Sequence, residues 1–302
     1  MAAERVQVGK YVDLMIDVAF KRVFGQPANK DLLIALLSVI IPEVKIDEIT
    51  YLDKERNGSG LDDKKSVFDI LCDTDQGEKV LVEVQVKPQK YFRDRTLYYA
   101  AQEILYEHRE SDIDYTLSSL YVISLLDFEL EHDSPAEDKF VWRYSLRENE
   151  TGETMTKALN FTFVELSKFN KKESELANLE DGLYFCLKHM GRLSERPDGL
   201  DAAIFRKLFE VAEFVALPAE QRKKYIAKMT TERDIINQIA YAREKGEEAG
   251  MAKGKAEGIA EGEANGEAKA RLQMAKDFKS NGVAIEIIAK CTGLAVEEVE
   301  AL

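Results

Sequence analysis

The strongest constraint on the fold is a pair of strand-like runs, 66–72 and 79–86, joined by a short turn. Both runs are rich in apolar and β-branched residues, and the segment between them is Asp-Thr-Asp-Gln-Gly-Glu. If the turn centres on Gln76, an antiparallel register places Asp69 directly opposite Glu83, because paired residues are equidistant from the turn. The sequence therefore predicts a β-hairpin that brings two carboxylates together.

Side-chain alternation predicts which face of this hairpin is buried. One face is apolar throughout: Phe68, Ile70, Cys72, Val80, Val82, Val84 and Val86. The other face carries Asp69 and Glu83 between Leu71 and Leu81. Like charges on cross-strand neighbours are destabilising, so a shared proton or a divalent cation would have to offset the repulsion. A solvent-facing hairpin that merely carries two acids is the alternative, and spacing alone does not decide between them.

The rest of the chain predicts an α/β fold in which a mixed sheet packs against helices. Apolar residues recur at helical or strand spacing in a consistent order. The predicted elements are helices over 12–24, 30–40 and 93–109 and strands over 46–52, 120–125, 141–146 and 161–166. Asn29 is the expected N-cap of the second helix, and Pro42 is expected to stop it.

The pattern divides the chain into four segments: a core over 1–170, a helical extension over 171–245, an arm over 246–270 and a small helical pair over 271–302. In the arm, glycine recurs at every fourth residue from Gly246 to Gly266. Each glycine inside a helix costs roughly 1 kcal/mol against alanine. Two interpretations stay open: a self-association stripe that makes a homo-oligomer, or a solvated helix or linker. The final pair is either a DNA-reading helix-turn-helix or a packing cap, and its few basic residues favour the cap.

Charge and hydropathy limit the kinds of partner and the location that we expect for this protein. The net charge of -14 argues against nucleic acid as a partner, although the stretch 87–95 is locally basic. The longest apolar run, 32–42, is too short to cross a bilayer, and the amino terminus has no apolar signal core. We therefore expect no membrane partner and a cytoplasmic location. The three cysteines are isolated in the sequence, so neither a disulfide framework nor a zinc site is expected.

Four segments of the chain resemble one protein family. Phe-Asp-Ile at 68–70 followed by Val-Glu-Val-Gln at 82–85 resembles the D…ExQ signature of the PD-(D/E)XK transposase, or recombination-promoting nuclease, family. The stretches 17–25 and 29–33 resemble its opening helices, and 95–99 resembles its Arg-x-x-x-Tyr element. The four segments occur in the family's order. The resemblance covers about residues 12–130 well and continues loosely to about 245.

The resemblance implies an α/β fold of the restriction-endonuclease-like type, with a mixed sheet flanked by helices and a helical C-terminal extension. It also implies a Mg²⁺-dependent (or Mn²⁺-dependent) endonuclease that hydrolyses phosphodiester bonds in DNA. In that case Asp69, Glu83 and the Val84 carbonyl are the metal ligands. Gln85, together with Asp69 and Glu83, completes the catalytic set. Glutamine stands where the broad superfamily has a lysine that orients the attacking water.

Three further roles stay open at this stage. Lys87 shares a face with Gln85 and could replace the missing positive charge, Asp17 could add a carboxylate ligand, and Arg95 could bind a phosphate or form a salt bridge. The acidic composition and the missing lysine also suit a second hypothesis. In it, the protein keeps a nuclease fold without catalysis and serves as an interaction or assembly module.

Overall fold

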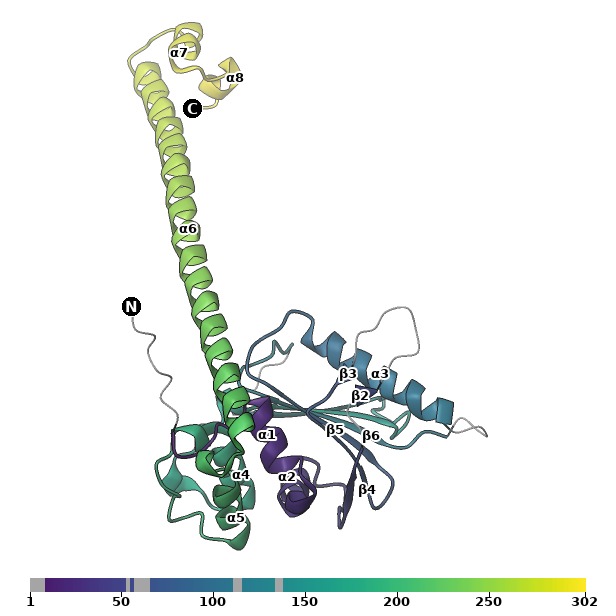
Figure 1. The fold of residues 1–302 in the computed structure, drawn as a ribbon. Coiled ribbons are helices and arrows are strands. Elements are labelled where there is room, and N and C mark those ends of the chain that lie inside the picture. The colour runs from purple at the N-terminus through teal and green to yellow at the C-terminus, as the bar shows by residue number, and fades with distance from the viewer. Residues whose placement is uncertain (1–8, 53–54, 57–65, 111–115, 134–137) are drawn as a thin grey trace. The chain divides into compact units, whose positions relative to one another are not determined.

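The computed structural model describes residues 9–52, 55–56, 66–110, 116–133 and 138–302 (Figure 1). The chain forms two compact units, Met1–Arg233 and Asp234–Leu302.

A six-stranded mixed sheet forms the centre of the first unit, in the order β1-β4-β5-β6-β8-β7. Its strands are β1 (Ile49–Tyr51), β4 (Ile70–Thr74), β5 (Lys79–Gln85), β6 (Leu120–Leu126), β7 (Val141–Ser145) and β8 (Leu159–Glu165). β1, β4 and β5 are antiparallel, β5, β6 and β8 are parallel, and β7 pairs antiparallel at the edge. A separate two-stranded sheet joins β2 (Glu55–Arg56) and β3 (Ser66–Val67). The predicted α/β class with a mixed sheet flanked by helices is confirmed.

Helices cover both faces of the sheet (Figure 1). One face packs in a single hydrophobic cluster against α1 (Asp17–Phe24), α2 (Lys30–Ile40), α4 (Leu179–His189) and α5 (Ala203–Val211). The other face packs against α3 (Phe92–Glu110). Short 3-10 turns lie at η1 (Pro27–Asn29), η2 (Leu166–Lys168), η3 (Glu173–Glu175), η4 (Met190–Arg192) and η5 (Phe214–Ala216). Helices from the expected extension, α4 and α5, thus share one core with the opening helices.

Asn29 has a different role from the one predicted. It precedes α2, but its side chain makes no capping hydrogen bond to that helix. Its amide instead donates to the carbonyl of Val23 at 3.0 Å, near the end of α1. The 3-10 turn at 27–29 separates the two helices and directs the buried amide back to the first one. Asn29 therefore satisfies a carbonyl at the end of one helix rather than an N–H at the start of the next.

Helix α6 runs without interruption from Ala219 to Ser280 and contains all six regularly spaced glycines. A side chain placed at any of these glycines would meet nothing within 4 Å. In the second unit the end of α6 packs against α7 (Ile285–Thr292) and α8 (Val296–Glu300) through Ala275, Ile288 and Val299. Gly293, with φ +72°, ends α7 in the left-handed conformation that a tight stop requires. Two short helices, α7 and α8, thus lie within the segment 271–302.

Among the described residues, no single helix is long and apolar enough to span a membrane. The bent pair made by Asp17–Phe24 and Pro27–Ile40 meets that test together, by length and composition only.

Candidate active site

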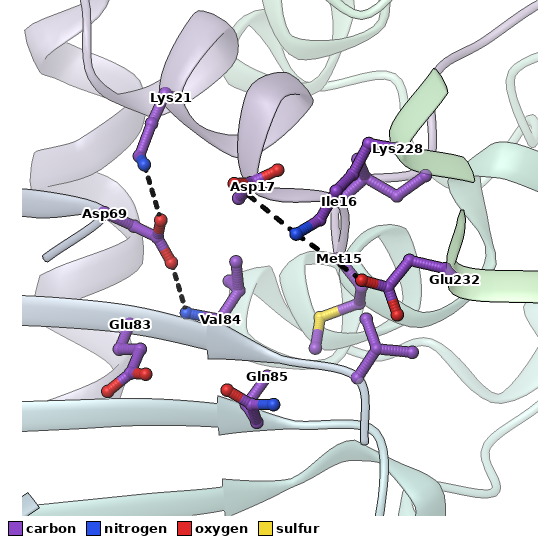
Figure 2. Close-up of a pocket in the computed structure, with 11 residues that line it drawn as sticks. Met15, Ile16, Asp17, Lys21, Asp69, Glu83, Val84, Gln85, Lys228 and Glu232 are labelled. Atoms are coloured by element: carbon purple, nitrogen blue, oxygen red, sulfur yellow. Dashed lines mark hydrogen bonds and ion pairs between the residues drawn. The ribbon is translucent and has the colours of Figure 1, made fainter. Parts of the chain in front are cut away.

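A cavity of about 190 Å³ lies where three parts of the first unit meet, and we call it the hairpin cavity (Figure 2). The segment leading into α1, the end of the β4–β5 hairpin and the first turns of α6 form its walls. Its lining comprises Met15, Ile16, Asp17, Lys21, Asp69, Glu83, Val84, Gln85, Val86, Lys228 and Glu232. The hairpin residues singled out from the sequence, Asp69, Glu83, Val84 and Gln85, are thus together in one cavity.

The register of the hairpin is the predicted one. Ile70 pairs with Val82 and Asp73 pairs with Lys79, which continues to Asp69 opposite Glu83. The paired ladder ends at Ile70, however, and Asp69 lies at a bend just before β4. The sequence register was therefore correct, and the strand that it predicted over 66–72 is broken at this point.

The bend changes where the neighbouring side chains go. Phe68 was predicted to share a face with Ile70, but it packs beside Leu71 and Leu81 and makes an edge-to-face contact with Tyr99 of α3. That prediction was wrong because alternation holds only along a continuous strand. At the bend, Asp69 turns toward α1. Its Oδ1 forms an ion pair with the Lys21 ammonium there, at 2.9 Å (Figure 2).

Asp69 also marks an open edge of β5. Its Oδ2 accepts a hydrogen bond from the Val84 N–H at 2.8 Å. The N–H and C=O of one strand residue point to the same side, so the Val84 carbonyl also faces the β4 side. The β4 ladder has already ended there, at the pair of Ile70 with Val82. A backbone oxygen is therefore positioned at the edge beside Asp69.

Glu83 lies on the α3 side of the same strand and is largely buried, with 16% of its side chain exposed. Its carboxylate forms an ion pair with Arg95 of α3 at 2.5 Å. Burial raises the pKa of Glu83 to about 7, against the lowering effect of the Arg95 charge and with a further increase from Asp69. Near neutral pH this carboxyl group therefore binds a proton more readily than an ordinary glutamate does.

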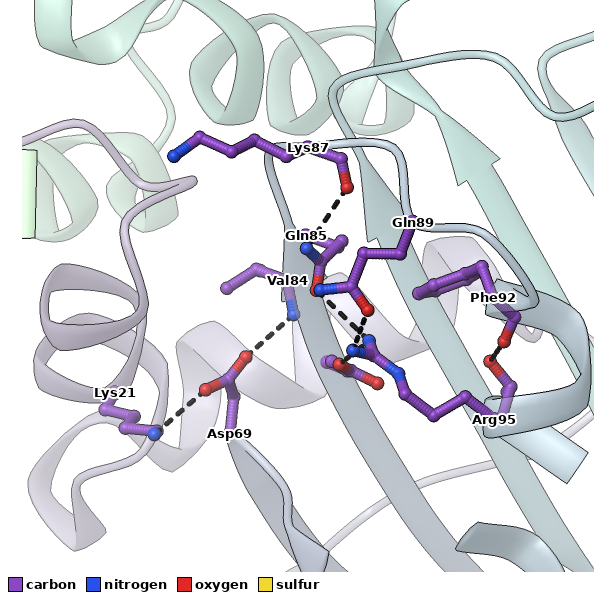
Figure 3. Close-up of polar contacts among 10 residues, drawn as sticks. Lys21, Asp69, Val84, Gln85, Lys87, Gln89, Phe92 and Arg95 are labelled. Atoms are coloured by element: carbon purple, nitrogen blue, oxygen red, sulfur yellow. Dashed lines mark hydrogen bonds and ion pairs between the residues drawn. The ribbon is translucent and has the colours of Figure 1, made fainter. Parts of the chain in front are cut away.

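The Arg95 guanidinium bridges Glu83 and Gln85 (Figure 3). It donates to Gln85 Oε1 at 3.1 Å and also to the side chain of Gln89. At its other end, the Gln85 amide donates to the backbone carbonyl of Lys87 at 3.1 Å. Of the two roles left open for Arg95, the salt bridge is the one that the structure contains. The Gln85 amide is held in one orientation by both contacts.

Helix α6 supplies residues that the sequence did not indicate. Glu232 forms an ion pair with Lys87 at 2.5 Å and with Lys228 at 3.5 Å. Lys228 in turn lies 4.0 Å from the carboxylate of Asp17. The Lys87 side chain is thus engaged by Glu232 rather than by Gln85. Asp17 lines the cavity, and its Oδ1 accepts a hydrogen bond from the Val18 N–H at 2.7 Å. Lys21, Lys228 and Glu232 lie far from the hairpin in sequence, so no local pattern points to them.

The oxygen donors of this cavity fit a hard divalent cation. Two carboxylates and a carbonyl, from Asp69, Glu83 and Val84, are the ligand type that Mg²⁺ and Mn²⁺ prefer. Within the part of the chain that the structure describes, no group of three or more His, Cys, Asp or Glu side chains is arranged to hold a metal. A cation here would therefore rely on the backbone oxygen as its third protein ligand. It would also compete with Lys21 and Arg95 for the two acids.

Comparisons with known proteins place this cavity in context. The family model described as PD-(D/E)XK nuclease family transposase matches residues 14–242, which is more than half of the chain and contains every residue that lines the cavity. No curated protein and no solved structure matches the chain.

Proposed function

Because the chain belongs to the PD-(D/E)XK nuclease family of transposases, we propose that it is a divalent-cation-dependent endonuclease that hydrolyses phosphodiester bonds in DNA. The observation that carries this proposal is the arrangement of Asp69, Glu83 and the open edge at Val84 around one cavity. Mg²⁺ or Mn²⁺ would be held by these two carboxylates and the Val84 carbonyl. When bound, such an ion polarises a phosphoryl oxygen and lowers the pKa of a bound water.

Gln85 is the residue that we assign to orienting the attacking water. A carboxamide has two N–H donors, and one of them is used by the Lys87 carbonyl. The second remains for a water molecule. A neutral amide cannot supply positive charge, but Arg95 lies against the same amide at 3.1 Å and carries a permanent one. Arg95 therefore replaces the charge of the missing lysine, whereas Lys87 is committed to Glu232.

Cleavage of supercoiled plasmid in Mg²⁺ or Mn²⁺ tests this proposal. We expect Asp69→Asn to lower the cleavage rate by at least about 100-fold, because it replaces a negatively charged metal ligand with a neutral amide. Asp73→Asn is the matched control, since Asp73 lies four residues further along the same hairpin, in β4, but pairs with Lys79 outside the hairpin cavity. Equal rates for the wild type and Asp69→Asn in both metals would contradict the assignment.

Thermal unfolding tests the cation site independently of catalysis. A ligand that binds only the folded state raises the melting temperature. We expect Mn²⁺ or Mg²⁺ to raise the melting temperature of the wild type and of Asp73→Asn, but not that of Glu83→Gln. An identical rise in all three would place the bound ion elsewhere.

A second candidate function follows from the two cations that already neutralise the hairpin acids. Lys21 and Arg95 hold Asp69 and Glu83 as a closed ion-pair set, which suits a nuclease fold used as an assembly module. Absence of both cleavage and metal-dependent stabilisation in a folded wild type would favour that function.

The homo-oligomer through residues 246–270 and the cytoplasmic location stay predictions. Light scattering on a chain lacking 246–270 tests the oligomer, since unchanged mass argues against self-association.

A further inference from the structure

A second cavity, of about 390 Å³, lies in the first unit around the end of α4, and we call it the basic cavity. Its charged lining is almost entirely cationic, with Glu173 as the one acid among the described lining residues. The cationic or protonatable members are Lys171, Lys172, Lys188, His189 and Arg192. In a chain with a net charge of -14, such a concentration of bases is a local feature that needs a ligand of opposite charge.

Only one of these bases forms a direct ion pair with a carboxylate in the described ranges. Lys171 forms an ion pair with Asp181 at 2.7 Å, but the Lys188 ammonium donates only to backbone carbonyls, those of Ser167 and Phe169 at 2.9 and 2.6 Å. Lys172 and Arg192 form no side-chain ion pair with any residue in the described ranges. Asp13 and Asp127 act on Arg192 and Lys188 only through longer-range electrostatics, so among the described residues Lys172 and Arg192 have no direct ion-pair partner that an anion would have to displace.

The crowding of like charges also appears in the titration of the cavity. Burial lowers the pKa of His189, and the charges of Lys188 and Arg192 lower it further. Burial and Arg192 likewise lower the pKa of Lys188, against the raising effect of Asp127. An anion among these groups would favour their charged forms.

The basic cavity adjoins the hairpin cavity through Asp127 and Asp13. Asp127 directly follows β6, and its N–H donates to the Gln85 carbonyl at 3.1 Å. Its carboxyl group is within electrostatic reach of Asp13, Arg192 and Lys188. Asp13 lies two residues before Met15, which lines the hairpin cavity.

A close backbone approach holds this junction together. An added Cβ at Gly191 would lie 2.8 Å from the Cβ of Asp13, so only glycine allows the segment before α1 to pack against η4. The bases at 188–192 are therefore fixed beside the wall of the hairpin cavity rather than on an independent surface.

We propose that the basic cavity binds the phosphodiester backbone of DNA and holds the strand beside the site that cuts it. Lys172 and Arg192 donate to phosphate oxygens, while Lys188 keeps its carbonyl bonds and contributes charge. This assignment rests on the proposed nuclease function, and it explains how an acidic protein engages a polyanion. The negative charge is spread over the chain, whereas the footprint for phosphate is concentrated in one cavity.

Binding of a fluorescently labelled DNA duplex, followed by anisotropy in EDTA over a salt series, tests the proposal without cleavage. The double variant Lys172→Glu/Arg192→Glu should bind at least about 10-fold more weakly, and its salt dependence should lose about 2 in log–log slope. The control is Lys45→Glu/Lys224→Glu, which changes net charge equally at two exposed lysines outside the cavity. Circular dichroism checks that both double variants fold.

Three outcomes would overturn the basic cavity as a backbone site. The first is no binding of duplex by the wild type at low salt, and the second is equal affinity and slope for the two double variants. The third is displacement of the duplex by inorganic phosphate beyond that caused by sulfate at the same ionic strength, which would assign the cavity to free phosphate.

Asp69→Asn separates the failure of this inference from the failure of the proposed function. We expect it to bind duplex like the wild type while losing plasmid cleavage. If cleavage does not depend on Asp69 but the Lys172→Glu/Arg192→Glu variant still loses binding, the nuclease assignment fails and the basic cavity stands. If cleavage depends on Asp69 and that double variant binds normally, the basic cavity fails alone.

Discussion

The hairpin cavity and the part of α6 that follows Asp234 use the same charged residue types in opposite ways. In the cavity, ion pairs join segments far apart in the sequence, such as Lys21 with Asp69, and the carboxylates are largely buried. Along α6 the pairs are three or four residues apart and exposed, such as Arg243 with Glu247 and Lys253 with Glu257. Burial makes each charge in the cavity costly to change, whereas exposed pairs contribute little. The comparison teaches that position decides what a charge does.

The largest expected effect is on the pH dependence of stability through Glu83. Its pKa rises from an ordinary 4.5 to about 7 on folding, so the folded state holds the proton more tightly. The stability that this protonation contributes is complete below the unfolded pKa and is lost as pH rises through 7. Glu83→Gln stays neutral at all pH values. In EDTA, its free energy of unfolding relative to that of the wild type should therefore increase by up to about 3 kcal/mol as the pH rises from about 5 to about 8.

Urea unfolding at the two pH values measures this difference. Glu247→Gln is the matched control, since Glu247 pairs with Arg243 on exposed α6, and its curves should follow those of the wild type at both pH values. Equal pH dependence in the wild type and Glu83→Gln would remove the electrostatic distinction between the two regions.

An intermediate effect is expected from the glycines of α6. Replacing Gly250, Gly254 and Gly258 by alanine should stabilise the helix by about 1 kcal/mol each, because an added Cβ meets nothing within 4 Å. Helical circular dichroism should rise and persist to higher temperature. A loss of oligomeric mass in the same variant would instead show that another chain packs on the glycines. In that case this part of α6 would not be exposed in the working protein.

The smallest expected effect is at an exposed ion pair. Arg243→Ala removes the i,i+4 pair with Glu247, and such pairs contribute about 0.3–0.5 kcal/mol. The change in unfolding free energy should therefore be barely measurable and should vanish at high salt. A loss of several kcal/mol would mean that this part of α6 is buried in the working protein.

Local periodicity predicted much of the fold. α2 occupies the predicted span, and β5, β6, β7 and β8 each lie within a few residues of their predicted positions. The hairpin register also followed from the turn alone. These features depend on short-range spacing, which the sequence displays directly.

The partners of the hairpin acids could not be predicted in the same way. Lys21 reaches Asp69 from α1, and Glu232 reaches Lys87 from α6. These pairs exist only because distant segments pack together, and no periodic pattern encodes that packing. The bend at Asp69 was missed for a related reason, because a residue-by-residue alternation assumes that the strand continues. The candidate site residues were thus visible in the sequence, but the residues that form ion pairs with them were not.

The segment between β4 and β5 makes no contact with the hairpin cavity, yet its length governs it. Asp69 stands beside Val84 because five residues, 74–78, separate the paired ladder on either side. One inserted residue would slide the strands by one step and exchange every inward side chain for its outward neighbour. Insertions and deletions, which surface turns usually tolerate, should therefore be disfavoured at this turn.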